Sequence, residues 1–154
     1  MKTKIGFIGA GDISILHAKG ISGLRNAELK GLWNITPELA LKKSEKYGCK
    51  NYSSCEALLA DSEIDAIFVL TSLEVHHKYV MMALEAGKHV FVEKPVGANL
   101  QEIRDMQSLA KSRNLICMPG HNYIYETPVQ RTKQLIDDGK LGDLVAIYIM
   151  YHIH

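Results

Sequence analysis

The sequence predicts an α/β fold: a doubly wound parallel sheet with helices on both of its faces. Short apolar runs rich in strand-forming residues alternate along the chain with longer stretches of helical periodicity. The connections between them are short, and glycine or proline stands at many of the expected ends. Such alternation favours a parallel sheet, because each helix returns the chain to the edge where the next strand starts.

Each element follows from its local pattern. Strands are expected at Lys4–Ile8, Leu29–Trp33, Lys50–Tyr52, Ala66–Leu70, His89–Val92 and Leu115–Met118. Helices are expected at Ile13–Ser22, Pro37–Tyr47, Ser54–Ala60, Val75–Ala86, Leu100–Arg113 and Thr127–Asp138. Pro37 suits a first helical turn, and Gly48 and Gly87 stand where helices should stop. A last strand is expected over Asp143–His154.

Composition excludes several classes of function. The chain has 154 residues, of which 47% are hydrophobic, which suits one folded domain or one domain plus a fragment. A net charge of +1, with scattered Lys and Arg residues, argues against nucleic acid and membrane surfaces as partners. No apolar run approaches the length of a membrane span. The three cysteines are odd in number and lack metal-ligand spacing, which indicates reduced thiols and a cytoplasmic location.

A glycine-rich stretch, Gly9-Ala-Gly-Asp-Ile-Ser14, lies between the first expected strand and the first expected helix. The dinucleotide-binding fingerprint G-x-G-x-x-G/A has its glycines at this junction. Gly9 would make the tight turn, and Gly11 would let a pyrophosphate approach the backbone beside Ala10. The N–H groups of Asp12 and Ile13 would face the phosphates. The alternative is a plain tight turn, but its place in the alternating pattern favours a Rossmann-type fold that binds a dinucleotide.

The fingerprint also predicts an acidic residue at the end of the second strand, where it holds the ribose hydroxyls. That position is Asn34 here. An amide can hydrogen-bond a hydroxyl but does not repel a 2′-phosphate, and no Arg follows in the loop. The cofactor is therefore NAD or NADP, with NAD slightly favoured.

The stretch Ala86-Gly-Lys-His-Val-Phe-Val-Glu-Lys-Pro95 places Glu93, Lys94 and Pro95 directly after a strand. Open α/β sheets bind ligands at this edge. Together with "GFIGAGDI", "EIDAIFVLT", "GHN" and "LIDDGKLGDL", this stretch resembles the N-terminal part of the Gfo/Idh/MocA oxidoreductases, named for glucose–fructose oxidoreductase and inositol dehydrogenase. The resemblance runs from Ile5 to about Val145.

The resemblance implies an NAD(P)-dependent oxidoreductase that acts on a sugar, cyclitol or related polyol. In such a family the lysine of Glu-Lys-Pro lies near the nicotinamide and the substrate hydroxyl, which assigns the catalytic role to Lys94 and places Glu93 and Pro95 at the cofactor. A cation beside the reacting carbon stabilises a developing alkoxide. The alternative for Lys94 is a solvated surface lysine. The family turn also implies a cis peptide bond before Pro95.

Two further matches are partial. The family pattern Thr-Pro-Asn-x-x-His appears here as Thr71-Ser-Leu-Glu-Val-His76, which keeps only its ends. The resemblance implies that Thr71, Ser72 and His76 belong to the cofactor site, although Leu73 lacks the polar group of the asparagine. Gly120-His-Asn122 matches a segment that borders the cofactor, which adds Asn122, but Ile124-Tyr125 replaces the Arg-Phe often found after it.

The remaining histidines have ordinary interpretations. His17, within the first helix, and His89, which opens a strand, are expected to be packing or capping residues. His76 and His77 are adjacent and point in different directions. His152 and His154 share one face of the last expected strand, but two ligands alone are weak support for a metal site, and we assign none.

The resemblance divides the chain into a dinucleotide-binding domain, residues 1–122, and the start of a second α+β domain, residues 123–154. Family members are well over twice this length, and their second domain supplies an Asp and a His near the reacting carbon. The expected catalytic set is therefore incomplete. The chain is either a cut or naturally truncated half or works with a partner chain. Its function is then either the cofactor-binding part of an oxidoreductase or a non-catalytic dinucleotide-binding sensor or scaffold.

The segment 144–154 is apolar on both faces over much of its length, as in a buried sheet. An exposed apolar strand with open edges is a template for pairing with another chain. We therefore expect a homo-oligomer in which this segment pairs with its counterpart.

Overall fold

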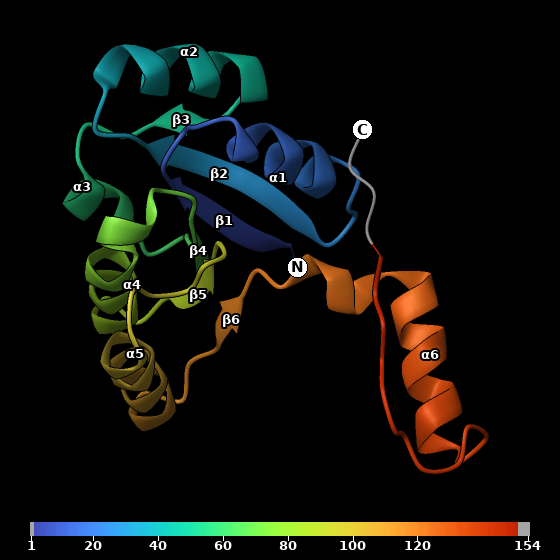
Figure 1. The fold of residues 1–154 in the computed structure, drawn as a ribbon. Helices are drawn as coiled ribbons and strands as arrows, with labels where there is room; N and C mark the ends of the chain where they lie inside the picture. Colours follow the sequence, from blue (N-terminus) through green and yellow to red (C-terminus); the bar gives the residue numbers. More distant parts are fainter. Residues whose placement is uncertain (1, 151–154) are drawn as a thin grey trace. The chain divides into compact units, whose positions relative to one another are not determined.

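The computed structural model describes residues 2–150, and the chain divides into two compact units, Met1–Gly120 and His121–His154 (Figure 1). The first unit holds the glycine-rich turn and the Glu-Lys-Pro stretch, and it contains the hydrophobic core. None of the helices within residues 2–150 has the length and apolar character needed to cross a membrane.

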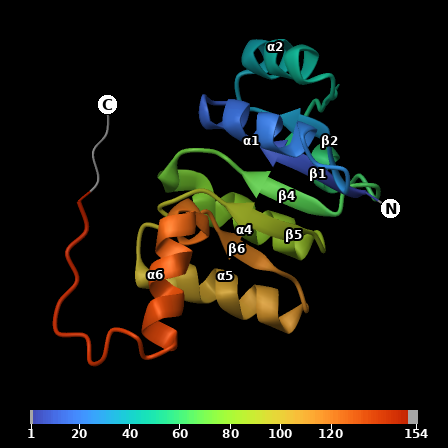
Figure 2. The ribbon, with the colours of Figure 1, turned by 90° about the vertical axis from the view of Figure 1, so that its right-hand side faces the viewer.

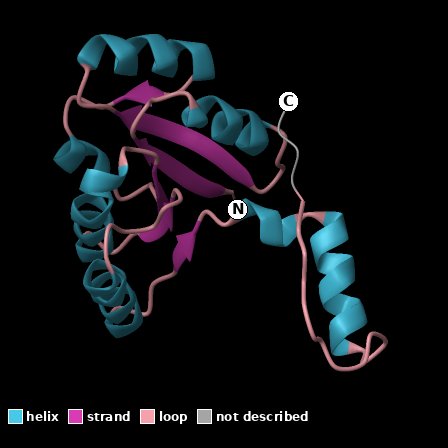
Figure 3. Ribbon diagram, in the orientation of Figure 1, coloured by secondary structure: helices cyan, strands magenta, loops and turns pink. Residues whose placement is uncertain are grey.

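The centre of the first unit is a parallel sheet, shown in magenta in Figure 3. In the described part of this unit six strands pair in the order β3-β2-β1-β4-β5-β6. Their bounds are β1 Thr3–Ile8, β2 Ala27–Trp33, β3 Lys50–Asn51, β4 Ala66–Val69, β5 His89–Val92 and β6 Cys117–Pro119. The order reverses beside β1, so the doubly wound topology expected from the alternating pattern is confirmed.

Helices cover both faces of this sheet, as Figures 1 and 2 show. On one face lie α1 (Ile13–Ser22) and α2 (Pro37–Tyr47). On the other lie α3 (Cys55–Leu59), α4 (His76–Glu85) and α5 (Leu100–Ser112). A single turn of 3₁₀ helix, η1 (Leu73–Val75), leads into α4, so the helix expected over Val75–Ala86 is found one residue shorter at each end.

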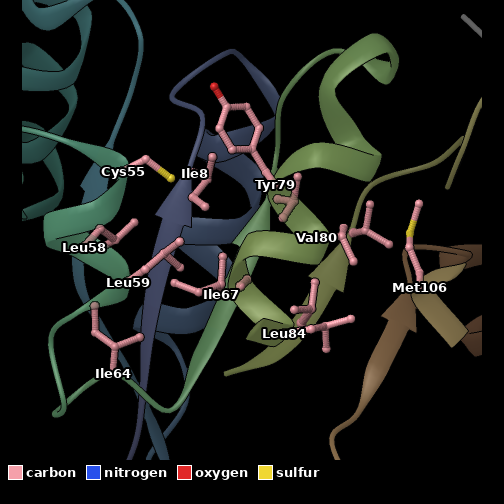
Figure 4. Packing of buried hydrophobic residues seen from close by; sticks show 14 of the residues in the cluster. Ile8, Cys55, Leu58, Leu59, Ile64, Ile67, Tyr79, Val80, Leu84 and Met106 are labelled. Atoms are coloured by element: carbon pink, nitrogen blue, oxygen red, sulfur yellow. The ribbon is translucent and has the colours of Figure 1, made fainter. Parts of the chain in front are cut away.

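The larger hydrophobic cluster lies between the sheet and the face that carries α3, α4 and α5 (Figure 4). Ile8 and Ile67 point from neighbouring strands toward Leu58 of α3 and toward Val80 and Leu84 of α4, and all five side chains are fully buried. Alternating strand residues therefore face this cluster, while Phe7 joins the second cluster under α1 and α2. Burial on both faces is what separates this sheet from a half-exposed one.

Local chemistry sets where several of these helices begin and end. Ser54 and Asn99 precede α3 and α5, and their side chains accept hydrogen bonds from the backbone N–H groups of Ala57 and Glu102. Gly48 ends α2 with a φ of 64°, the left-handed conformation that glycine adopts without strain. The expected bounds of α1 and α2 are confirmed residue for residue.

The second unit contains the short 3₁₀ helix η2 (Asn122–Tyr125) and α6 (Thr127–Asp137). Residues 143–150 form no strand, so the strand expected over 143–154 is wrong for this part, and residues 151–154 lie outside the described residues. A strand needs the backbone groups of a neighbour to pair with, and apolar composition alone does not supply them. The boundary at residue 122 and the membership of this unit in a second α+β domain stay predictions.

Candidate dinucleotide-binding site

The carboxyl ends of the strands meet at one edge of the sheet, and the backbone there continues as an ordered row. Leu70 N–H donates to the carbonyl oxygen of Ile8 at 2.8 Å, and Glu93 N–H donates to that of Val69 at 3.1 Å. Gly9 N–H donates to the carbonyl oxygen of Trp33 at 2.9 Å. The glycine-rich turn, the loop after β4 and the Glu-Lys-Pro stretch therefore begin side by side, although they are far apart in sequence.

The two glycines of the turn, Gly9 and Gly11, are needed for different reasons. Gly9 has a φ of +104°, and a Cβ placed there would lie 2.7 Å from the carbonyl oxygen of Leu70. Any larger residue at this position therefore meets both strain and backbone. A Cβ at Gly11 would meet nothing within 4 Å. The glycine at position 11 is thus not required by the packing of this chain, which leaves close approach of a ligand as its reason.

Backbone N–H groups at the start of α1 are available to a ligand. Within the described residues the N–H groups of Gly11, Asp12 and Ile13 have no acceptor, as expected for a first helical turn. The buried Ser14 hydroxyl donates to the carbonyl oxygen of Gly11 at 2.6 Å and lies 2.8 Å from the hydroxyl of Tyr47. Ser14 therefore fills the third small position of the fingerprint and also ties the turn to α2. Unpaired N–H groups at a helix N-terminus favour an anion.

Asn34 lies at the end of β2, where the sequence predicts a contact with ribose. Its Oδ1 accepts a hydrogen bond from the N–H of Ala10 at 3.0 Å, and its Nδ2 donates to the carbonyl oxygen of Thr36 at 3.3 Å. The side chain thus supports the glycine-rich turn. One Nδ2 hydrogen remains for a further acceptor.

A pocket of about 540 Å³ opens beside the turn. All of its lining residues are uncharged, and they come from the turn, from the chain after β2 and from the loop after β4. They are Gly9, Gly11, Trp33, Asn34, Ile35, Thr36, Leu39, Leu70, Thr71, Ser72, Val75 and Tyr79. The rings of Trp33 and Tyr79 meet edge to face, with centroids 5.7 Å apart. Burial raises the pKa of the Tyr79 phenol, so its hydroxyl, which points away from the hydrophobic cluster in Figure 4, stays protonated at neutral pH.

Of the residues predicted from the loop after β4, Thr71 and Ser72 line this pocket, and Ser72 is exposed. His76 does not reach it with its polar atoms. Its ring is 1% exposed, with Nδ1 2.9 Å from the carbonyl oxygen of Pro95 and Nε2 3.0 Å from that of Thr71. The buried ring joins the loop after β4 to the Glu-Lys-Pro stretch, and a contact between His76 and the cofactor stays a prediction.

The Glu-Lys-Pro stretch turns sharply after β5, with a cis peptide bond between Lys94 and Pro95, as the sequence predicts. Glu93 is 9% exposed. Lys94 is exposed, and within residues 2–150 its ammonium group makes no hydrogen bond or ion pair. Glu93 is thus part of the support of the loop, and Lys94 is the polar group that this loop presents to solvent.

Sequence reasoning missed the role of His17. Nε2 of His17 donates to Oε1 of Glu93 at 2.7 Å, across a sequence separation of 76 residues. The His17 ring also packs against Phe7, Phe68 and Phe91, as the expected packing role requires. The local signal was that His17 follows the buried Ser14 by three residues and so shares the sheet-facing side of α1.

Asn122 begins η2 in the second unit, so its part in the cofactor site stays a prediction. Burial raises the pKa of the Cys49 and Cys55 thiols to about 11, which keeps them protonated at neutral pH and unsuited to nucleophilic chemistry. Nowhere in residues 2–150 do three His, Cys, Asp or Glu side chains gather as metal ligands. The pair His152 and His154 lies outside the described residues.

The sheet order, the positive φ of Gly9, the open N–H groups and the pocket at the carboxyl edge define the class: a Rossmann-type dinucleotide-binding protein. Comparison with known families gives the particular family. Residues 3–121 match the family described as "Oxidoreductase family, NAD-binding Rossmann fold", the Gfo/Idh/MocA family. The chain belongs to this family, and the resemblance read from its motifs is confirmed.

Curated relatives include glucose-6-phosphate 3-dehydrogenase of Bacillus subtilis, 32% identical over 96% of this chain and 42% of the relative. Inositol 2-dehydrogenase of Rhizobium meliloti is 28% identical over 97% of this chain and 45% of its own length. Among solved structures, scyllo-inositol dehydrogenase from Lactobacillus casei, with bound NAD(H) and scyllo-inositol, is 29% identical with a TM-score of 0.85, over 93% of this chain and 43% of that one. The chain thus spans less than half the length of these relatives.

Proposed function

We propose that this chain binds NAD(H) at the glycine-rich turn and presents Lys94 to the site of hydride transfer in an oxidoreductase acting on a sugar, cyclitol or related polyol. The observation that carries the proposal is Gly11. Its missing Cβ serves no packing purpose in the chain itself, and it borders three N–H groups without acceptors. A pyrophosphate is the group that such a cradle fits.

The residues present fit a dinucleotide along the whole edge. The N–H groups of Gly11, Asp12 and Ile13 would hold the pyrophosphate, and the uncharged pocket with Trp33 and Tyr79 would take the adenosine. The remaining Nδ2 hydrogen of Asn34 would donate to a ribose hydroxyl. When bound, the cofactor supplies the nicotinamide ring that accepts or returns the hydride.

We favour NAD over NADP. No Lys or Arg lines the pocket beside Asn34, so nothing there would neutralise a 2′-phosphate. An amide in place of the usual carboxylate removes the repulsion that excludes NADP, which leaves the preference small. Competitive titration with NADH and NADPH tests this, and tighter binding of NADPH would overturn it.

Lys94 has the chemistry that the transfer needs. Its ammonium is exposed and unpaired within the described residues, so it can bind a substrate hydroxyl without first breaking an ion pair. A cation at that hydroxyl stabilises the negative charge that develops on oxygen as hydride leaves carbon. The competing assignment, a solvated surface lysine, does not explain why both neighbours of Lys94 are held by side chains from other elements.

The substrate class comes from the relatives, which are sugar and inositol dehydrogenases by name. Because no side chain within residues 2–150 forms a hydrogen bond or ion pair with the Lys94 ammonium, we expect this chain alone to have no significant dehydrogenase activity. Robust oxidation of any polyol by the purified chain would contradict this expectation.

Titration calorimetry with NADH tests cofactor binding directly. Gly11→Trp should keep the fold, because the space around Gly11 is open, and should lose binding. Gly20→Trp is the matched control, since Gly20 lies on the exposed side of α1, which follows the turn, and a Cβ there also meets nothing within 4 Å. If Gly11→Trp is folded by circular dichroism and binds NADH with unchanged affinity, the proposal is wrong.

We further propose that the chain self-associates through residues 144–154 and works in the cytoplasm. The apolar side chains of Val145, Tyr148, Ile149 and Met150 are each more than four-fifths exposed, a surface that a second copy would cover. The free cysteines suit a reducing compartment. Light scattering on the full chain and on a version ending at Gly142 tests the association. A monomer in both cases would refute it.

A further inference from the structure

Both oxygens of the Glu93 carboxylate are bound, each by a different part of the chain. Oε1 accepts from Nε2 of His17 on α1 at 2.7 Å, and Oε2 accepts from the backbone N–H of Lys94 at 3.0 Å. The side chains of His17 and Glu93 are 20% and 12% exposed. A carboxylate so far removed from water needs donors at its oxygens, so this side chain has few alternative positions.

The His17 ring is itself fixed by the sheet. Phe7, Phe68 and Phe91 occupy paired positions on β1, β4 and β5, and Phe68 stacks on both of the others. The His17 ring meets all three edge to face, at centroid distances of 6.5, 5.6 and 5.0 Å. His17 therefore holds Glu93 from a rigid platform rather than from a free side chain.

One helix thus reaches both chemical parts of the site. The open N–H groups lie where α1 begins, and the next turn of α1 carries His17, which donates to Oε1 of Glu93. The other oxygen of Glu93 accepts from the backbone N–H of Lys94. A neutral ring at His17 suffices for this contact, because only Nε2 must carry a proton. On the opposite face of the sheet, His76 holds the carbonyl oxygen of Pro95.

We propose that His17 is a positioning residue for Lys94, acting through Glu93, so that the helix which binds the pyrophosphate also sets the place of the reacting lysine. This inference rests on the proposed function of Lys94 beside the nicotinamide. It separates His17 from an ordinary packing residue, because packing against three rings requires no donor toward Glu93.

The test compares three variants of the full chain. His17→Leu keeps an apolar side chain against the Phe rings and removes the donor, whereas His17→Gln keeps an N–H donor of similar reach. Leu16→Ala, at an exposed position of the same helix, is the control. Two measurements are made on each: the hydrogen-exchange rate of the Lys94 amide in the free chain, and the affinities for NADH and for ADP-ribose, which lacks the nicotinamide.

In His17→Leu we expect the Lys94 amide to exchange about tenfold faster and NADH affinity to fall about tenfold, with ADP-ribose affinity unchanged. His17→Gln should retain most of both properties, and Leu16→Ala should match the wild type. If His17→Leu does not fold, Glu93→Leu replaces it, because an aliphatic side chain accepts from neither His17 nor the backbone N–H of Lys94. Its expected results are the same.

Three outcomes overturn the inference. The Lys94 amide exchanges at the wild-type rate in His17→Leu; NADH and ADP-ribose lose affinity equally, which would place the effect on α1 as a whole; or His17→Gln behaves like His17→Leu. A wild-type chain that binds neither ligand would instead refute the proposed function, and the exchange rate would still decide whether His17 holds the loop.

Discussion

Two lysines stand at the two ends of strand β5 and have opposite surroundings. Lys88, just before the strand, is 8% exposed, and its ammonium donates to the carbonyl oxygens of Asp61 and Ile64, both at 2.8 Å. Lys94, just after the strand, is exposed and unpaired within residues 2–150. The same residue type is structural at one end and available for chemistry at the other.

The difference extends along both edges of the sheet. At the amino edge Lys4 and Lys30 both pair with Glu63, and the Tyr52 hydroxyl donates to Asp61 at 2.6 Å. At the carboxyl edge the N–H groups at the start of α1 and the ammonium of Lys94 have no protein partner in the described residues. Helices following parallel strands place their N–H ends at the carboxyl edge and their carbonyl ends at the amino edge. The described lysines of the amino edge therefore have protein partners, whereas the carboxyl edge keeps N–H groups open to an anionic ligand.

The largest effect is expected at the turn that keeps the carboxyl edge open. Gly9→Ala should lower the free energy of unfolding by about 2–4 kcal/mol, because a Cβ meets the Leu70 carbonyl and φ is positive. Gly11→Ala should change it by less than about 0.5 kcal/mol. Urea denaturation of both variants measures the contrast, and equal stabilities would show that the turn tolerates a side chain.

Lys88→Met should lower the free energy of unfolding by about 2–3 kcal/mol, since a buried and a part-buried carbonyl oxygen lose their donor while the methylene volume is kept. Its affinity for NADH should stay at the wild-type value, because the change lies at the edge remote from the turn. If thermal unfolding shows that Lys88→Met is as stable as the wild type, Lys88 has no structural role and does not differ from Lys94 in this respect.

Lys94→Met should have the opposite effects, with unchanged stability and weaker NADH binding. Its stability should stay within about 0.5 kcal/mol of the wild type, because no protein contact of the ammonium is lost. NADH affinity should fall about fivefold, and ADP-ribose affinity should not change. Calorimetry with the two ligands measures this. Equal NADH binding by Lys94→Met and wild type would argue for a solvated surface lysine.

The smallest expected effect is on the stability of the protein at acidic pH. Hydrogen bonds and charge interactions with Lys30 and Lys4 lower the Glu63 pKa from 4.5 to about 2. A folded-state pKa below the unfolded value stabilises the protein above about pH 4.5, and this contribution is lost as the pH falls toward 2. The thermal midpoint of Glu63→Gln should therefore depend less on pH in that interval than that of the wild type. Because the Glu63 side chain is half exposed, high salt should reduce the difference in pH dependence between the two proteins. A difference that does not change with salt would contradict an origin in solvent-exposed ion pairs.

The amino-acid sequence by itself determined the alternating elements, the glycine-rich turn and the ligand-binding edge. These depend on local properties: apolar periodicity, capping residues and the conformational freedom of Gly9 and Gly48. The cis bond before Pro95 and the family itself followed from motifs that are contiguous in the chain.

Only the tertiary structure decided which polar side chains are occupied by the protein. It joined His17 to Glu93, turned Asn34 toward Ala10, and buried His76 between two loops that the sequence assigned to the cofactor. It also left residues 143–150 without a strand. Each of these outcomes depends on which groups meet across the fold, and a pattern of neighbours along the chain carries no information about a partner 76 residues away.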